Sequence, residues 1–157
     1  TYSGSGYSVA GAGDMNRDGY ADIIIGVLNA TDHSTGASYI IYGDVFLDNI
    51  NLANLTSAQG FSITGVQVGS SVSSPATGVG DVNNDDYADI IIGAPGANNY
   101  AGISYVIYGG TSLGSINLAN LTSVQGFSIA GVQNSLCGFS VSGAGDVNND
   151  GGTRKCV

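Results

Sequence analysis

Three segments of this chain carry oxygen-bearing side chains at the same alternating spacing. Each reads Gly-Asp-x-Asn-x-Asp, and the first two add another aspartate at position nine, counted from the first aspartate. The candidate ligands are Asp14, Asn16, Asp18 and Asp22; then Asp81, Asn83, Asp85 and Asp89; then Asp146, Asn148 and Asp150. A tight loop with this pattern suits Ca²⁺, which binds about 6–8 oxygens at roughly 2.3–2.6 Å. The spacing therefore predicts repeated calcium loops.

Other interpretations of a single loop are weaker. An EF-hand needs a bidentate glutamate at position twelve and flanking helices, but position twelve from Asp14 is Ile25, within a strand-like run. A dockerin-like loop fails for the same reason, since helices should follow it. An isolated copy is equally well explained as a solvated turn rich in Asp and Asn. Recurrence in register favours metal loops.

The charge of the chain is concentrated in these loops. All 12 acidic residues are aspartates, nine of them lie in the three segments, and the net charge is −9. Three bound Ca²⁺ ions would bring that charge to about −3. So few basic residues argue against nucleic-acid binding, which needs clustered Lys and Arg. No stretch reaches the roughly 20 apolar residues that span a bilayer, so we expect no membrane insertion.

A longer unit surrounds each loop. The first aspartates of the loops are separated by 67 and then 65 residues, and residues 51–67 recur at 117–133 with only two differences. Such fidelity indicates tandem supersecondary units that bury their apolar faces against one another.

Within a unit, the periodicity is that of β-strands. Strands are predicted over residues 7–10, 21–26, 37–43 and 61–65, from alternation or from runs rich in Ile and Tyr. Residues 52–59 are too short for an independent helix and predict a turn or a single helical turn. Four antiparallel strands per tandem unit predict an all-β fold of β-propeller blades. The alternative, a row of independent hairpin modules, would leave the isoleucine runs uncovered.

These residues resemble a known family. Gly-Asp-x-Asn-x-Asp-Gly-Tyr-x-Asp-Ile-Ile-Ile-Gly, followed in the second unit by Gly93-Ala94-Pro95, is similar to the FG-GAP repeat, the blade unit of integrin α-subunit propellers and of many bacterial secreted proteins. The resemblance implies about two and a third blades, at residues 1–66, 67–133 and 134–157. It also implies Ca²⁺ in the loop between the first two strands, with the carbonyls of Tyr20 and Tyr87 as further ligands.

The chain departs from the family pattern at several positions. Ser5, Val68 and Cys137 stand where the family has phenylalanine, and Val27-Leu28 follow the glycine where Ala-Pro is expected. Asp86 replaces the loop glycine. Aspartate tolerates a left-handed backbone better than most residues. Position nine of the third loop is Arg154, a cation where a ligand belongs.

The other reactive residues offer little for catalysis. His33 is the only histidine, it lies in a polar hairpin tip, and there is neither a glutamate nor a Gly-x-Ser-x-Gly turn. We therefore predict no enzymatic activity. Cys137 is expected to be buried as an apolar residue, or else to form a disulfide with Cys156 in a secreted protein. Asn29, Asn54 and Asn120 begin glycosylation sequons, which only a glycosylating host would use.

Together these features predict an extracellular or cell-surface calcium-binding module for adhesion or assembly. The chain does not open at Thr1 with a basic-then-apolar signal-peptide pattern, so we expect a mature chain or a fragment. Two blades leave apolar faces bare, so the expected partners are further blades of a longer chain or copies of itself packed head-to-tail, as a ring or a filament. An extracellular protein or glycan ligand is also compatible. The alternatives are a self-assembling structural protein and a scaffold fragment of a larger enzyme or receptor.

Overall fold

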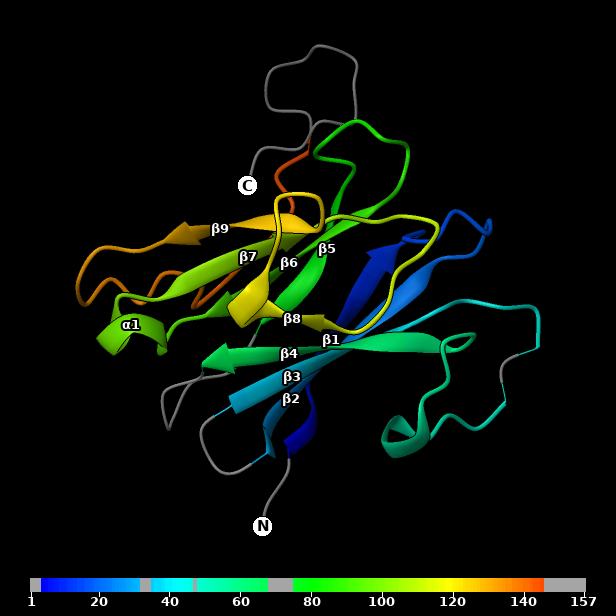
Figure 1. Cartoon of the computed structure of the whole chain (residues 1–157), viewed down its shortest axis with the longest axis horizontal. Helices are drawn as coiled ribbons and strands as arrows, with labels where there is room; N and C mark the ends of the chain where they lie inside the picture. The colour runs from blue at the N-terminus through cyan, green and yellow to red at the C-terminus, as the bar shows by residue number, and fades with distance from the viewer. Residues whose placement is uncertain (1–3, 32–34, 47, 68–74, 146–157) are drawn as a thin grey trace.

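The computed structural model describes residues 4–31, 35–46, 48–67 and 75–145 of the chain. These residues form two β-sheets that pack against each other, one above the other in Figure 1. The strands of the first repeat are β1 (Gly4–Gly13), β2 (Asp22–Thr31), β3 (Thr35–Ile41) and β4 (Gly60–Gln67). Those of the second repeat are β5 (Ala76–Gly80), β6 (Asp89–Ala94), β7 (Ile103–Ile107), β8 (Ile116–Asn117) and β9 (Gly126–Ala130).

Each repeat folds into one four-stranded antiparallel meander. The strand orders are β1-β2-β3-β4 and β5-β6-β7-β9. The isoleucine runs form the second strand of each sheet, paired on both sides, as a continuous β-branched run favours. The predicted all-β fold of blade-like, four-stranded units is therefore confirmed.

Strand β8 crosses from the second repeat to the first sheet. It pairs in parallel with β4, with Ile63 opposite Ile116 and Thr64 opposite Asn117. Beside this pairing, the Oγ atoms of Ser62 and Ser115 lie 3.1 Å apart. A two-residue strand gives no sequence signal of its own, and the prediction did not include it.

Short helical turns interrupt the strands. The predicted turn is a 3₁₀ helix in both repeats, Leu52–Asn54 and Leu118–Asn120, each capped by the preceding asparagine. The sequence did not predict α1 (Ala97–Tyr100), in which Asn98 and Asn99 have left-handed backbone angles. No helix in the described residues is long and apolar enough to cross a membrane.

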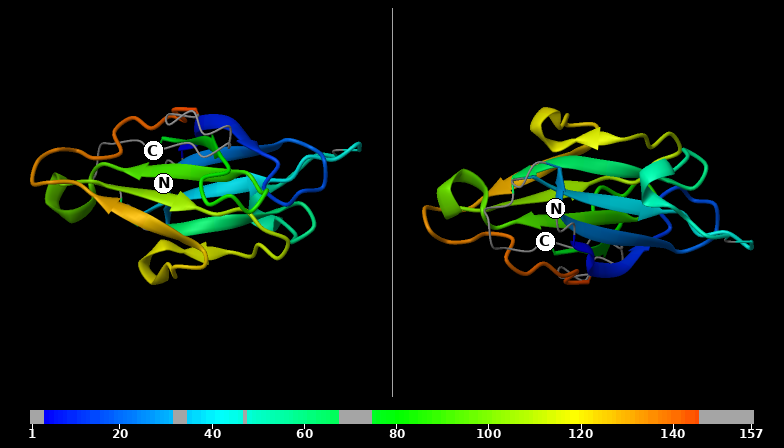
Figure 2. Two further views of the ribbon diagram at one scale, coloured as in Figure 1. Left: turned by 90° about the horizontal axis from the view of Figure 1, so that it is seen from above. Right: turned by 90° about the horizontal axis from the view of Figure 1, so that it is seen from below.

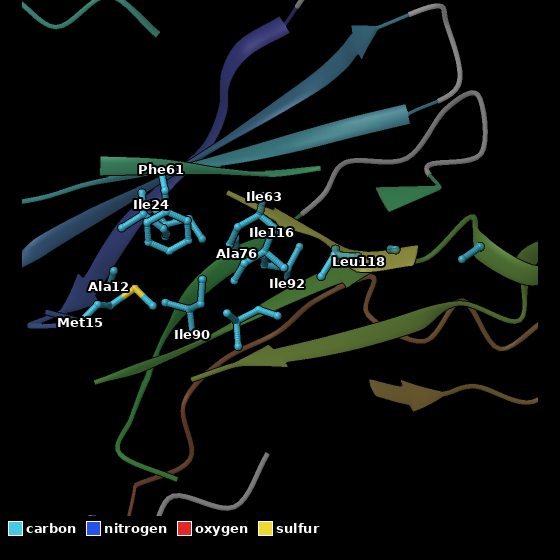
Figure 3. Close-up of a cluster of buried hydrophobic side chains, with 14 residues drawn as sticks. Ala12, Met15, Ile24, Phe61, Ile63, Ala76, Ile90, Ile92, Ile116 and Leu118 are labelled. Atoms are coloured by element: carbon cyan, nitrogen blue, oxygen red, sulfur yellow. The ribbon is translucent and has the colours of Figure 1, made fainter. Parts of the chain in front are cut away.

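The main core lies between the two sheets. Ile24, Ile40, Phe61 and Ile63 of the first sheet pack against Ile90, Ile92, Ala94 and Ile107 of the second, with Ile116 and Leu118 closing the edge (Figure 3). Viewed from above and from below, the two sheets overlap (Figure 2). The two repeats therefore form one hydrophobic core, as expected for tandem units that bury each other's faces.

Residues 138–145 cover part of the far face of the second sheet. Val141 packs against a small cluster of Val79, Ile91 and Val106. The expected third blade predicts a first strand at residues 138–141, but these residues form no strand; the preceding residue, Cys137, makes an isolated bridge to Gly102. The start of this segment packs closely on β6, because a Cβ on Gly93 would lie 1.9 Å from the Gly138 carbonyl oxygen.

Candidate metal loops

The first loop, residues 14–22, joins β1 to β2 and wraps its backbone around the Asp14 carboxylate. Asp14 Oδ1 accepts from Asp18 N at 3.1 Å, and Oδ2 accepts from Gly19 N at 3.0 Å. The Asp18 carboxylate accepts from Tyr20 N at 2.9 Å and from Asn16 Nδ2 at 2.7 Å. The side chains at positions one, three and five are therefore gathered on one side of the loop.

The second loop, residues 81–89, repeats this arrangement between β5 and β6. Asp81 Oδ1 accepts from Asp85 N at 3.1 Å, and Oδ2 accepts from Asp86 N at 2.9 Å. The Asp85 carboxylate accepts from Tyr87 N at 3.0 Å and from Asn83 Nδ2 at 2.7 Å. Matching bonds in two loops of different sequence show that the spacing of the polar residues determines the conformation.

Both loops need residues that accept a left-handed backbone. Positions four and six have positive φ in each loop: 60° at Arg17, 92° at Gly19, 64° at Asn84 and 70° at Asp86. Asn and Asp adopt this conformation more readily than most residues, so Asp86 replaces the loop glycine without changing the fold of the loop.

The aspartates at position nine lie beneath the loops rather than among the exposed ligands. Asp22 accepts from Met15 N at 2.8 Å and from Gly43 N at 2.9 Å. Asp89 accepts from Val82 N at 2.7 Å and from Gly109 N at 2.9 Å. Each carboxylate thus ties the second residue of its loop to the end of the third strand. Both side chains are buried, at 2% and 0% exposure.

Burial changes the acidity of these two groups. Desolvation raises the pKa of Asp22 and raises the pKa of Asp89 to about 6, against the lowering effect of the backbone N–H bonds. The neighbouring loop aspartates add a smaller upward contribution. A bound cation would favour the ionised form of both groups.

The donor set suits a hard cation. Positions one, three and five offer carboxylate and amide oxygens, and the oxygens at position nine accept one backbone bond each, which leaves them a further lone pair. In the described residues, no three acidic, His or Cys side chains are already gathered around one point. Metal binding would therefore draw the position-nine carboxylate and positions one, three and five together.

Sequence comparisons identify the units that carry the loops. The FG-GAP repeat family matches residues 5–41 and 75–107, which span both loops and the strands on either side. These two segments are FG-GAP repeats. Among its relatives are integrin alpha pat-2 of Caenorhabditis elegans, 34% identical over 61% of the chain, and human integrin alpha-11, 29% identical over 88%.

A third relative is named as an enzyme. Bovine phosphatidylinositol-glycan-specific phospholipase D is 33% identical over 69% of the chain. The chain spans only 8%, 11% and 14% of the length of these three proteins. The FG-GAP match and the integrin relatives together support an integrin-like β-propeller module.

Two glycines are part of the site, although the ligand pattern did not identify them. Gly43 and Gly109 donate the N–H groups that hold the position-nine carboxylates. A Cβ on Gly43 would lie 2.5 Å from Ala21 O, and one on Gly109 would lie 2.4 Å from Ala88 O. The sequence signal was the Ile-Tyr-Gly triplet that ends the third predicted strand of both repeats.

Several other predicted sites can be placed only in part. The third loop with Asp146, Asn148 and Asp150, as well as His33 and Cys156, lies outside the described residues, as does the side chain of Asn29. Asn54 and Asn120 are exposed, as a glycosylation site must be. Cys137 is half-buried, with Sγ 3.7 Å from Ser104 Oγ and 3.8 Å from the Ile129 carbonyl oxygen.

Proposed function

We propose that this FG-GAP module binds one Ca²⁺ in each of the two described loops and acts as a calcium-stabilised propeller module in adhesion or assembly. The observation that carries the proposal is the matching arrangement of oxygens at positions one, three and five in both loops. In loop one the ligands would be Asp14, Asn16, Asp18, Asp22 and the Tyr20 carbonyl. In loop two they would be Asp81, Asn83, Asp85, Asp89 and the Tyr87 carbonyl.

The ion would supply electrostatic stabilisation rather than chemistry. Each loop brings three aspartates within nine residues, with a fourth at Asp86 in loop two, and a divalent cation offsets their mutual repulsion. Extracellular modules typically bind Ca²⁺ at about 10⁻⁴–10⁻³ M. Sites of that affinity fill outside a cell and stay empty in the cytosol, so we place the module outside the cell or on its surface.

A non-enzymatic role follows from the residues that surround the loops. The loop carboxylates accept hydrogen bonds from backbone N–H groups of their own loops, which favours a role in holding the loops over paired acid–base work. The phospholipase D relative keeps a second role open: in a longer enzyme these repeats would be a scaffold, and its catalytic groups would lie elsewhere.

Calorimetric titration tests the calcium proposal. The metal-stripped chain should bind about two Ca²⁺, and the variant Asp14→Ala/Asp81→Ala should bind neither of them. Asp44→Ala changes an exposed aspartate outside the loops and should leave both sites intact. Absence of heat and of any thermal stabilisation at millimolar Ca²⁺ would refute the proposal.

We further propose that another FG-GAP blade, from a longer chain or from a second copy, covers the outer faces. Equivalent residues of the two repeats differ sharply in exposure where a neighbouring sheet is missing. Ile90, against the first sheet, is 0% exposed, whereas its counterpart Ile23 is 39% exposed. Phe61, against the second sheet, is 4% exposed, whereas its counterpart Phe127 is 41% exposed. We therefore expect the further blade to pack on these outer faces in the same way as the two sheets of this chain pack on each other.

Light scattering tests this second proposal on the purified chain in millimolar Ca²⁺. Concentration-dependent association that Phe127→Asp abolishes would support head-to-tail packing. A monodisperse, well-folded monomer would refute association between copies.

A further inference from the structure

The two described loops are in direct contact through their backbones. Ala88 N of the second loop donates to Asp14 O of the first at 3.0 Å. Gly110 N, three residues after β7, donates to Met15 O at 2.8 Å. Neither bond belongs to a β-ladder. They join the segments that carry the predicted ligands of two different ions.

The first of these bonds acts on a predicted ligand of the second loop. The N–H of Ala88 and the carbonyl of Tyr87 belong to one planar trans peptide. In such a unit the N–H and C=O point in opposite directions, so holding the N–H against loop one directs the Tyr87 carbonyl away from it. The acceptor that fixes this orientation is the backbone carbonyl of Asp14, whose own carboxylate is the first predicted ligand of loop one.

The second bond completes a path between the two buried carboxylates. Asp22 accepts from Met15 N at 2.8 Å, and the Met15 carbonyl accepts from Gly110 N at 2.8 Å. The adjacent residue, Gly109, donates its N–H to Asp89 at 2.9 Å. Position nine of one loop is thus joined to position nine of the other by consecutive backbone groups and hydrogen bonds, without a gap.

A side-chain contact reinforces the same junction. Arg17, at position four of loop one, places a guanidinium nitrogen 3.2 Å from Asp86 Oδ2 of loop two, and its Cζ lies 5.9 Å from the centre of the Tyr87 ring. Asp86 stands where loop one has Gly19. Because both side chains are mostly exposed, this pair adds little free energy by itself. It does counter the extra negative charge of loop two.

We infer that the two loops bind Ca²⁺ with positive cooperativity, because filling one loop fixes backbone groups that orient ligands of the other. This inference rests on the proposed calcium function. Linkage requires the effect to be reciprocal, and coupling between sites typically changes affinity by about 5–150-fold. Repulsion between the two ions opposes this effect and is weakened by physiological salt.

Calorimetry on single-loop variants tests the coupling. Asp18→Ala disables loop one at an exposed side chain, and Asp85→Ala does the same in loop two. Each should weaken binding at the remaining loop by about fivefold or more, and by the same factor. Asp44→Ala should leave both affinities unchanged. If the wild-type chain binds Ca²⁺ but neither variant changes the affinity of the remaining loop, the inference is wrong and the calcium proposal stands. Failure of the wild-type chain to bind Ca²⁺ would refute the calcium proposal itself.

A backbone variant tests the path directly. Gly110→Pro removes the N–H that donates to Met15 O, whereas Gly110→Ala keeps it in a position with no heavy atom closer than 3.8 Å to the new Cβ. The proline variant should lose most of the cooperativity and the alanine variant should keep it; equal cooperativity in both would exclude this path. As an independent readout, Ca²⁺ added to Asp85→Ala should slow hydrogen exchange at Ala88 and Gly110. Unchanged exchange there would contradict the inference.

Discussion

Replacing Asp89 with alanine tests whether a buried carboxylate holds the second loop together without metal. The change leaves the N–H groups of Val82 and Gly109 without their acceptor. An unsatisfied buried donor costs about 1–3 kcal/mol, so the two together should lower the free energy of unfolding by about 2–6 kcal/mol. That value applies at acidic pH, where the wild-type carboxyl is protonated in the folded state.

The cost of this substitution should fall as the pH rises. The pKa of Asp89 is raised from 3.8 to about 6 in the folded protein, so between these values the folded state binds more protons than the unfolded state. Wild-type stability from this group is therefore fully present below pH 3.8 and is lost as the pH rises through about 6. At about 1.4 kcal/mol per pKa unit, the full change is about 3 kcal/mol, of which about 2 kcal/mol falls between pH 4.5 and pH 7.5.

Urea unfolding in chelator, at pH 4.5 and at pH 7.5, measures this difference. Asp89→Ala should be less stable than wild type at pH 4.5, by a margin about 2 kcal/mol larger than at pH 7.5. Asp44→Ala, at an exposed position, should change stability by less than about 0.5 kcal/mol at either pH. A wild-type-to-mutant difference that does not vary with pH would refute the reasoning about Asp89.

Further substitutions test other parts of the molecule. Asp14→Ala should abolish the part of the Ca²⁺-dependent rise in melting temperature that comes from loop one, measured by thermal scanning with and without millimolar Ca²⁺; a full rise would mean that Asp14 is not a ligand. Ile90→Ala should cost about 2–5 kcal/mol in denaturant unfolding, and Ile23→Ala clearly less in a monomer, because Ile23 is 39% exposed; equal losses would show that another sheet covers Ile23. Gly60→Ala would place a Cβ 1.9 Å from Ile40 O at a φ of 148° and should cost more than about 1 kcal/mol, whereas Gly110→Ala should be tolerated; equal stabilities by the same assay would contradict the strain argument at Gly60.

Local signals were enough to predict the four strands of each antiparallel meander and the loop between the first two. The isoleucine runs ending in glycine identify β2 and β6, and the Gly-Asp-x-Asn-x-Asp phrase determines a loop in which the bonds to the first aspartate from positions five and six recur in both repeats. These features depend on neighbours within about ten residues, which the sequence displays directly.

Contacts between distant residues could not be predicted in this way. Position nine was predicted only as a ligand, yet Asp22 and Asp89 also bond to glycines 21 and 20 residues away. The pairing of β8 with β4, and the backbone bonds between the loops, depend on how one sheet packs on the other. The repeat predicted that the units pack together, but not which backbone groups meet between them.

The crossing of β8 into the first sheet separates the unit of sequence from the unit of folding. Residues 116–117 belong by repetition to the second repeat, but their ladder partner is β4 of the first, and Ile116 and Leu118 are buried in the shared core. A genetic duplication or exchange of one repeat would therefore carry away a strand that its neighbour needs. Recombination that preserves the fold should place its junctions so that the 111–118 segment travels with the sheet it completes.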